Sequence, residues 1–208
     1  MKRSITLAFI ALCYLTTFNA SAQNSENSKS SGKAYSEGDV SLNAGISLGT
    51  IGYGWGYGWS SSFSLPLTAT LDIGVHEYFS VGGYAGYMGR SYKDAWGGRT
   101  YKHTFRSYNF GVQGTFHASS FLNSEFDFNI NDTKVDYYVR LLLGYEVYSW
   151  KYDDSWNNSY INYNTSSGRM IFGPVVGVRY MFSPNVGGYI EGGRGAFGWL
   201  TLGVSFKM

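Results

Sequence analysis

The stretch WLTLGVSFKM (residues 199–208) alternates strictly between apolar and polar side chains. One set of alternate positions carries Leu200, Leu202, Val204, Phe206 and Met208, and the other carries Thr201, Gly203, Ser205 and Lys207. A period of two is that of a β-strand whose two faces meet different surroundings. The stretch therefore predicts an amphipathic strand, and the rest of the chain must supply its neighbours.

Seven earlier segments of about ten residues show the same alternation. They lie at 40–48, 63–73, 79–88, 106–116, 135–148, 170–182 and 186–193, and the segment at 135–148 is the clearest. Alternating segments of this length, separated by turns, are typical of membrane β-barrels. The sequence therefore predicts an all-β fold, an eight-stranded antiparallel up-and-down transmembrane β-barrel.

The connections between these segments differ in length. Long links at 49–62, 89–105 and 149–169 predict loops at one end, and short turns at 74–78 and 183–185 predict the other end. An even strand number places both termini on the periplasmic side. The link at 118–134 is too long for a tight turn, so we expect either that its flanking strands extend beyond the membrane or that it packs as a periplasmic hairpin.

The start of the chain has the layout of a cleavable signal peptide at 1–22. Lys2 and Arg3 precede an apolar run, which is followed by small residues at 20–22. Residues 23–39 are rich in Ser, Asn, Gly and Lys and predict a flexible periplasmic tail before the barrel domain at 40–208. Cys13 is the only cysteine, so we expect no disulfide or thiol chemistry in the mature chain.

Composition agrees with a membrane barrel. The chain holds 28 Gly, 19 Tyr, 14 Phe and 6 Trp, and only 14% of its residues are charged. The expected signal contains two of the 16 Lys and Arg residues and none of the 14 Asp and Glu residues, so the mature chain has no formal net charge. A basic surface for nucleic acid is therefore not expected.

Charged residues occupy the polar faces of several predicted strands. An eight-stranded barrel has an interior just wide enough for side chains, where charges are tolerated only in pairs. Two interpretations remain open: the pairs hold the barrel together, or they rearrange to open a narrow channel for ions or small solutes. The expected lumen charge network consists of Asp72, Asp136, Arg140, Glu146, Arg179 and Glu191.

Aromatic residues alternate with glycine in the first long link, at Tyr53, Trp55, Tyr57 and Trp59. One interpretation is a girdle at the level of the lipid headgroups, where amphipathic rings prefer to lie. The other is an adhesive or ligand-stacking surface, to which aromatic residues of the other long links would contribute. These four residues are therefore candidate surface ligand contacts.

Signals for catalysis and cofactors are weak. His76, His103 and His117 are the only histidines, and none lies in an evident constellation with a nucleophile or paired carboxylates. Residues 127–138 resemble the start of a calcium loop but lack its turn glycine and its closing glutamate. We therefore expect no enzyme, no metal site and no cofactor.

The last strand also carries a more specific pattern. Thr201, Gly203, Phe206 and Met208 resemble the C-terminal signal read by the barrel-assembly machinery during outer-membrane insertion. With the strand centres at 144–145, 177–180 and 189–191, residues 40–208 resemble the outer-membrane protein beta-barrel domain family, the small barrels of the OmpA and OmpX types.

The resemblance implies a location and a range of roles. The location is the outer membrane of a gram-negative bacterium, where the protein would be a monomer in contact with lipid and lipopolysaccharide. The implied role is structural or one of surface interaction, in envelope integrity or adhesion. Narrow permeability, an outer-rim enzyme and an accessory part in a secretion complex are the alternatives.

Overall fold

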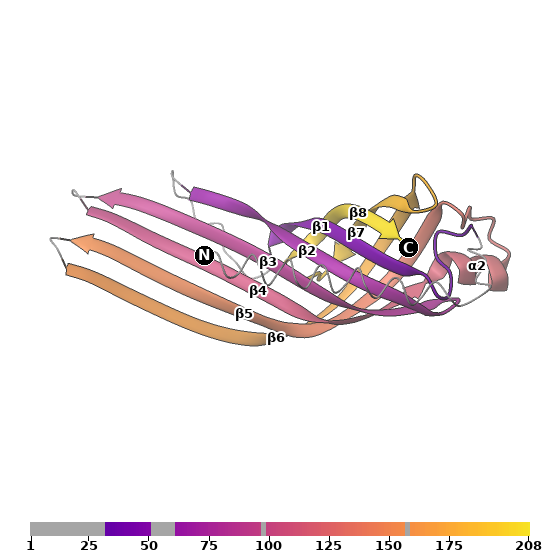
Figure 1. Ribbon diagram of the computed structural model, residues 1–208, viewed down its shortest axis with the longest axis horizontal. Coiled ribbons are helices and arrows are strands. Elements are labelled where there is room, and N and C mark those ends of the chain that lie inside the picture. Colours follow the sequence, from indigo (N-terminus) through magenta and orange to yellow (C-terminus); the bar gives the residue numbers. More distant parts are fainter. Residues whose placement is uncertain (1–31, 51–60, 97–98, 157–158) are drawn as a thin grey trace. The chain divides into compact units, whose positions relative to one another are not determined.

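The computed structural model describes residues 32–50, 61–96, 99–156 and 159–208. Consecutive strands pair antiparallel, and β1 also pairs with β8, so the sheet closes into a barrel (Figure 1). The predicted fold class is confirmed. The strands are β1 (Val40–Thr50), β2 (Ser61–His76), β3 (Phe79–Trp96), β4 (Arg99–His117), β5 (Val135–Trp156), β6 (Ser159–Met181), β7 (Val186–Gly193) and β8 (Gly198–Lys207).

The barrel exposes its apolar face and buries its polar face. On β5, Val139, Leu141 and Leu143 are 42, 50 and 49% exposed, whereas the intervening Arg140 is 2% exposed. A soluble barrel needs the opposite arrangement. A closed sheet that pairs its own backbone amides and presents apolar side chains outward suits a hydrocarbon environment. Among the described residues, no helix is long and apolar enough to cross a membrane.

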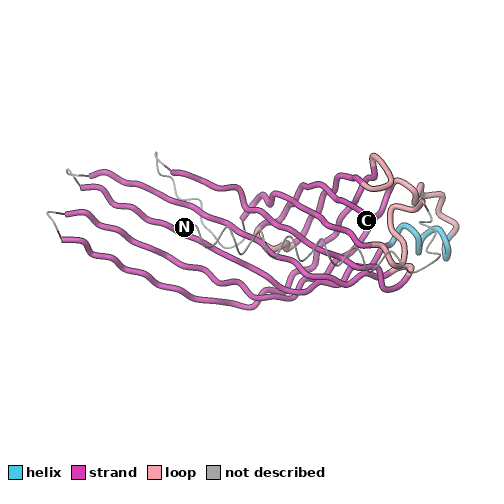
Figure 2. The backbone as a smooth tube through the Cα atoms, in the orientation of Figure 1, coloured by secondary structure: helices cyan, strands magenta, loops and turns pink. Residues whose placement is uncertain are grey.

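Strands β3 to β6 are much longer than the sequence predicts, at 18 to 23 residues each. Their pairing continues to Trp96 opposite Arg99 and to Trp156 opposite Ser159. The prediction of loops at 89–105 and 149–169 is therefore wrong: these residues form two adjacent β-hairpins (Figure 2). Their alternation is absent because polar and apolar residues share both faces once the sheet leaves the barrel.

We call these extensions of β3 to β6 the projecting sheet, residues 89–96, 99–105, 149–156 and 159–169. They define the hairpin end of the barrel. The opposite end, which we call the terminal end, carries the β2–β3 and β6–β7 turns and the last residue, Met208.

The connection at 118–134 begins with a helix, α2 (Ala118–Phe126), and neither expected alternative is correct. Phe121 on this helix makes edge contacts with Tyr78, Phe116 and Phe126, at centroid distances of 5.4 to 5.9 Å. The helix ends at Asp127, whose left-handed φ of 52° lets its N–H bond back to the carbonyl of Leu122. An aromatic cluster therefore holds this connection against the terminal end.

Residues 32–39 do not behave as the expected flexible tail. The compact unit of the structure begins at Gly32, and Ala34 and Tyr35 are buried. A composition average over 23–39 misses these two residues because the surrounding Ser, Asn and Gly dominate it. The expected signal peptide at 1–22 and the rest of the expected tail lie outside the described residues.

The exposed apolar belt predicts a depth-dependent cost for charge. Leu141→Arg places a cation at the centre of the belt and should destabilise the barrel by about 2–4 kcal/mol, whereas Phe182→Arg near the terminal end should cost at most about 1 kcal/mol. Urea unfolding from lipid vesicles, followed by tryptophan fluorescence, measures both. Equal costs at the two positions would contradict a membrane-embedded belt.

Candidate functional site

The centre of the lumen is closed by Arg140, which reaches three neighbouring groups. Its Nη1 donates to Glu191 Oε1 at 2.5 Å, its Nη2 to Asp72 Oδ2 at 3.2 Å, and its Nε to Thr115 Oγ1 at 3.1 Å. All four residues are at most 8% exposed. One guanidinium on β5 therefore ties together β2, β4 and β7 across the interior.

The two carboxylates of this cluster are further satisfied by neutral donors. Asp72 accepts from Gln113 Nε2 at 2.6 Å and from Asn43 Nδ2 at 3.2 Å. Glu191 accepts from the Tyr138 hydroxyl at 2.8 Å. Buried charges are stable only with such partners, so this cluster is a cross-brace of the barrel and fills the lumen at its level.

The six residues of the predicted network fall at three levels. Asp72, Arg140 and Glu191 form the central cluster. Arg179 and Asp136 approach each other, at 3.7 Å, nearer the terminal end. Glu146 lies nearer the hairpin end, where it bonds Ser107 and pairs with Arg169 at 2.6 Å. Sequence reasoning missed Arg169 because it fell within an expected loop.

Apolar side chains fill the lumen on the hairpin side of the charges. The β7–β8 connection turns inward, where Asn109 Nδ2 donates to the carbonyl of Ala196 at 2.8 Å and Phe197 is 1% exposed. The β7–β8 connection is therefore part of the interior packing. The buried apolar cluster consists of Tyr84, Met88, Phe105, Leu142, Val175, Ala196 and Phe197.

Residues 32–39, which we call the strap, close the terminal end. Lys207 Nζ donates to the carbonyl of Lys33 at 2.6 Å and pairs with Asp39 at 3.2 Å. Backbone bonds join Gly38 and Asp39 to Gly74, and join Ala34 to the carbonyl of Asp132 at 2.7 Å. The strap is therefore attached to β2, to β8 and to the loop before β5.

Tyr35 is the deepest side chain of the strap. Its ring stacks on the imidazole of His117 with centroids 3.4 Å apart and planes within 4°. Its hydroxyl donates to the carbonyls of His76, at 2.7 Å, and Phe79. Burial, helped by the charge of Asp136, raises the pKa of the Tyr35 phenol far above its usual range, so this donor stays protonated.

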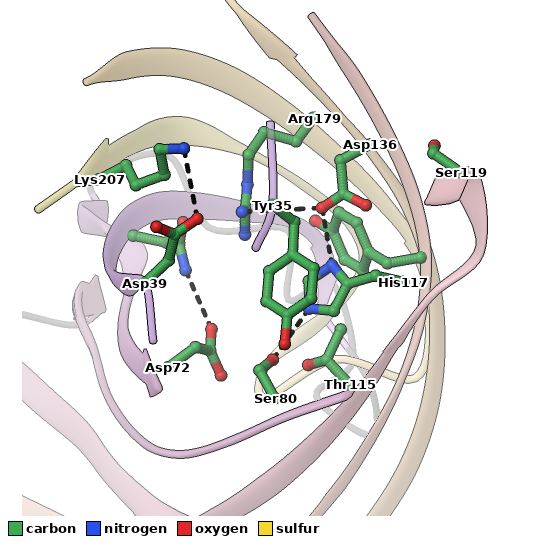
Figure 3. Close-up of polar contacts among 12 residues, drawn as sticks. Tyr35, Asp39, Asp72, Ser80, Thr115, His117, Ser119, Asp136, Arg179 and Lys207 are labelled. Carbon is green, nitrogen blue, oxygen red and sulfur yellow. Dashed lines mark hydrogen bonds and ion pairs between the residues drawn. The ribbon is translucent and has the colours of Figure 1, made fainter. Parts of the chain in front are cut away.

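Beneath Tyr35 lies a chain of three buried polar side chains (Figure 3). Ser80 Oγ lies 2.9 Å from His117 Nε2, and His117 Nδ1 lies 2.8 Å from Asp136 Oδ2. The three residues are 2, 2 and 1% exposed. The order of these groups is that of a Ser-His-Asp triad, in which each ring nitrogen has a separate partner.

Sequence reasoning missed this constellation although the signal was present. Ser80, His117 and Asp136 are all at inward positions beside strand ends on three consecutive strands. The other two histidines lie elsewhere: His76 is near the β2–β3 turn, and His103 packs on the ring of Tyr152 at 4.7 Å in the projecting sheet.

The residues of the expected insertion signal lie on both faces of β8. Thr201 is buried in the lumen, and Phe206 and Met208 are exposed on the outer face. Gly203 lies beneath the ring of Tyr189, where a Cβ would come within 2.5 Å of a ring carbon. The structure thus explains the glycine of the pattern by a close aromatic contact inside the barrel.

Two further expectations concern loops and metals. Tyr53, Trp55, Tyr57 and Trp59 lie outside the described residues. In the part of the chain that the structure describes, no group of three His, Cys, Asp or Glu side chains is arranged to hold a metal ion.

Fold and site together define a small transmembrane β-barrel with a filled lumen. No family model and no curated protein matches the chain. Its fold is similar to that of solved eight-stranded outer-membrane barrels. The N-terminal β-barrel domain of Pseudomonas aeruginosa OprF is 12% identical, with a TM-score of 0.45, over 84% of this chain and 100% of that one.

Two other solved structures have a similar fold. Ail, the attachment invasion locus protein of Yersinia pestis, solved in complex with the heparin analogue sucrose octasulfate, is 13% identical, with a TM-score of 0.46, over 82% of this chain and 96% of that one. Neisserial surface protein A is 14% identical, with a TM-score of 0.39, over 82 and 96%.

The central cluster predicts a large cost for removing its cation. Arg140→Met leaves two buried carboxylates without their charge partner and should destabilise the barrel by about 3–5 kcal/mol. Lys33→Met is the matched control, because Lys33 and its partner Asp132 are 43 and 20% exposed, and it should cost less than about 1 kcal/mol. Urea unfolding measures both variants.

A rescue variant separates charge from packing. Combining Arg140→Met with Asp72→Asn and Glu191→Gln removes the unpaired charges while keeping similar volumes, so it should be more stable than Arg140→Met alone. A triple variant less stable than Arg140→Met alone would show that the unpaired carboxylates are not the cause of the lost stability, and that Arg140 contributes mainly by its packing.

Proposed function

We propose that this protein is an outer-membrane surface-interaction protein, which binds another macromolecule through its projecting sheet and does not conduct solutes. The observation that supports this proposal is the projecting sheet itself: among the described residues, the first part of its outer strand, β6, pairs with a strand on one side only. Three filled levels of the lumen support the absence of conduction: the strap, the central charges and the apolar cluster.

The free edge belongs to the first part of β6. Pairing between β6 and β7 begins at Val175 opposite Gly193, whereas pairing between β5 and β6 begins at Ser159. In the described part of the chain, residues 159–168 therefore pair with β5 on one side and with no strand on the other. Such an edge presents backbone N–H and C=O groups that can pair with an extended segment of another protein.

The sequence of this edge lacks two features that commonly prevent strand addition. Natural edge strands are protected by lysine, proline, inward charges or a covering segment. Residues 159–168 read SYINYNTSSG, with no lysine and no proline, and the side chains at 164–168 are all exposed. Small polar residues favour a soluble edge that still accepts a partner strand.

Aromatic side chains of the projecting sheet would add contacts to such a partner. Trp150 is 46% exposed and packs on Phe105 at a centroid distance of 4.5 Å, so its position is fixed. Preorganised aromatic residues are common anchors of binding surfaces. In this proposal Tyr53, Trp55, Tyr57 and Trp59 are further candidate ligand contacts, and an aromatic girdle is the alternative role for them.

Location and orientation follow from the proposed role. The hairpin end would face the outside of a gram-negative cell and the terminal end the periplasm, since an even strand number returns both termini to that side. Lipid and lipopolysaccharide would surround the belt of a monomeric barrel, and the signal on β8 would be read by the barrel-assembly machinery.

Paired substitutions on the edge test the proposal. In an antiparallel pair, alternate residues direct both N–H and C=O away from the neighbouring strand, so either Thr165 or Ser166 offers its N–H outward. Proline at that position should weaken binding of extended peptides about tenfold without unfolding the barrel, because it removes one outward donor. Alanine at each position keeps the N–H and is the matched control.

The measurement uses peptides selected from a phage-displayed library on the folded protein in nanodiscs. Fluorescence anisotropy then compares wild type with each proline and alanine variant, and heat-modifiable gel migration confirms folding. Unchanged peptide binding in both proline variants would contradict edge pairing. Loss of binding in the Trp55→Ala, Trp59→Ala double variant alone would assign the surface to the first loop.

A flux measurement distinguishes surface interaction from a channel. Liposomes that contain the refolded protein should show no more ion or sugar flux than empty liposomes, and Arg179→Ala should leave this unchanged because the central charges still fill the lumen. Clear flux through the wild-type barrel, raised further by Arg179→Ala, would instead support the narrow channel.

A further inference from the structure

We propose that Ser80, His117 and Asp136 form a nucleophilic site at the terminal end of the lumen, that the strap covers it, and that displacement of the strap lets Ser80 accept an acyl group from an ester. This site lies at the opposite end of the barrel from the projecting sheet, so the inference is independent of the proposed binding surface.

The location of the three residues makes access from the terminal end short. Ser80 is the second residue of β3, His117 is the last residue of β4, and Asp136 is the second residue of β5. All three therefore lie at the rim, on the inner face. The strap residue Tyr35 lies over the imidazole and separates the chain of polar groups from this end of the lumen (Figure 3).

The hydrogen bonds assign a role to each group. With Asp136 accepting from Nδ1–H of His117, Nε2 of the ring has its lone pair directed at the Ser80 hydroxyl. This is the tautomer in which imidazole acts as a general base toward serine. Asp136 orients the ring and offsets the positive charge that the ring gains when it takes the proton.

Thr115 supplies a donor beside the nucleophile. It is the direct cross-strand partner of Ser80, and its Oγ1 accepts the Nε–H of Arg140 at 3.1 Å. Because that bond uses an oxygen lone pair, the Thr115 hydroxyl proton remains available to donate. A negatively charged oxygen that develops next to Ser80 would thus meet a hydroxyl polarised by a buried guanidinium.

The cover is attached in a way that allows it to leave. Tyr35 closes the site through its ring stack and through its hydroxyl bonds to carbonyls on either side of the β2–β3 turn. The strap contributes no strand to the barrel, and the side chains of its ion pair between Lys33 and Asp132 are 43 and 20% exposed. Its other attachments include the largely buried ion pair between Lys207 and Asp39 and backbone bonds to β2 and to the loop before β5. None of these belongs to the pairing between strands, so the strap can detach while the closed sheet stays intact.

The chemical step is acyl transfer from an ester to Ser80. The Oγ atom attacks the carbonyl carbon while its proton moves to His117 Nε2. The ester C–O bond then breaks, the departing alkoxide takes that proton and leaves as an alcohol, and the acyl group stays on Ser80. No redox partner is needed. A fluorophosphonate follows the same first step, losing fluoride and leaving a stable phosphonyl group on the serine.

The test uses a fluorophosphonate probe on the full-length folded protein in detergent micelles. Tyr35→Ala removes the covering ring and should raise the labelling rate about 100-fold or more over wild type, with the adduct mapped to Ser80 by mass spectrometry. In the Tyr35→Ala background, Ser80→Ala should abolish the adduct, and His117→Asn should lower the rate about 100-fold because the base is lost. Tyr35→Phe keeps the aromatic ring over His117, so its labelling rate should be lower than that of Tyr35→Ala.

A second measurement reports independently whether reagents reach the site. Diethyl pyrocarbonate modification of His117, followed by peptide mapping, reports whether Tyr35→Ala opens the site, and heat-modifiable migration confirms the fold. His117 modified without any adduct on Ser80 would show that the serine is not activated and would overturn the proposal. His117 still protected in the folded variant would overturn the assignment of the strap as the cover, and labelling that survives His117→Asn would overturn the role of the base.

Discussion

The narrowness of a closed eight-stranded sheet is the constraint on which the rest of the structure depends. Its interior has room for side chains and little else, so each charge placed there needs a partner from another strand. Arg140 meets this need with Asp72 and Glu191, and its further bond to Thr115 means that one guanidinium joins four strands. The same crowding explains why glycines such as Gly203 lie opposite Tyr189: a ring occupies the space that a second side chain would need.

The fold was predictable where lipid imposes a pattern and unpredictable where it does not. Within the belt outward residues are mostly apolar, so alternation marks β1, β2, β7 and β8 and the barrel parts of β3 to β6. Beyond the belt, Trp150 and Phe105 pack on each other while neighbouring positions are polar, and the period disappears although the ladder continues to Trp96 and Trp156. Helix α2 was missed because its stability comes from Phe121 meeting rings on other elements, a contact that local sequence does not contain.

The candidate sites, like the fold, were predictable only in part. The alternation of inward and outward residues along each strand places Arg140, Glu191 and Asp72 inside the barrel. Which of these charges meet depends on the register between strands, and Glu146 pairs outside the central cluster, with Arg169. The same alternation predicts that Ser80, His117 and Asp136 point inward, because the residues before them, Phe79, Phe116 and Val135, are outward apolar residues of three adjacent strands. The stack of Tyr35 on His117 was not accessible, because it joins segments 82 residues apart and needs the strap to fold back over the rim.

The two ends of the barrel differ because different physical demands act on them. At the hairpin end β6 continues past the point where its pairing with β7 stops, so among the described residues the first part of β6 pairs with β5 alone. At the terminal end every strand stops at nearly the same level, and the inward polar side chains would meet water if nothing covered them. The strap meets that demand with one aromatic ring, backbone bonds and the ion pair between Asp39 and Lys207, which leave His117 buried but add no strand to the sheet. A cover of that kind can be removed without opening the barrel. Removing the carboxylates that pair with Arg140, in contrast, would break contacts that join strands of the barrel. The terminal end is therefore the part of the interior where chemistry can be exposed and hidden again while the membrane-spanning structure stays the same.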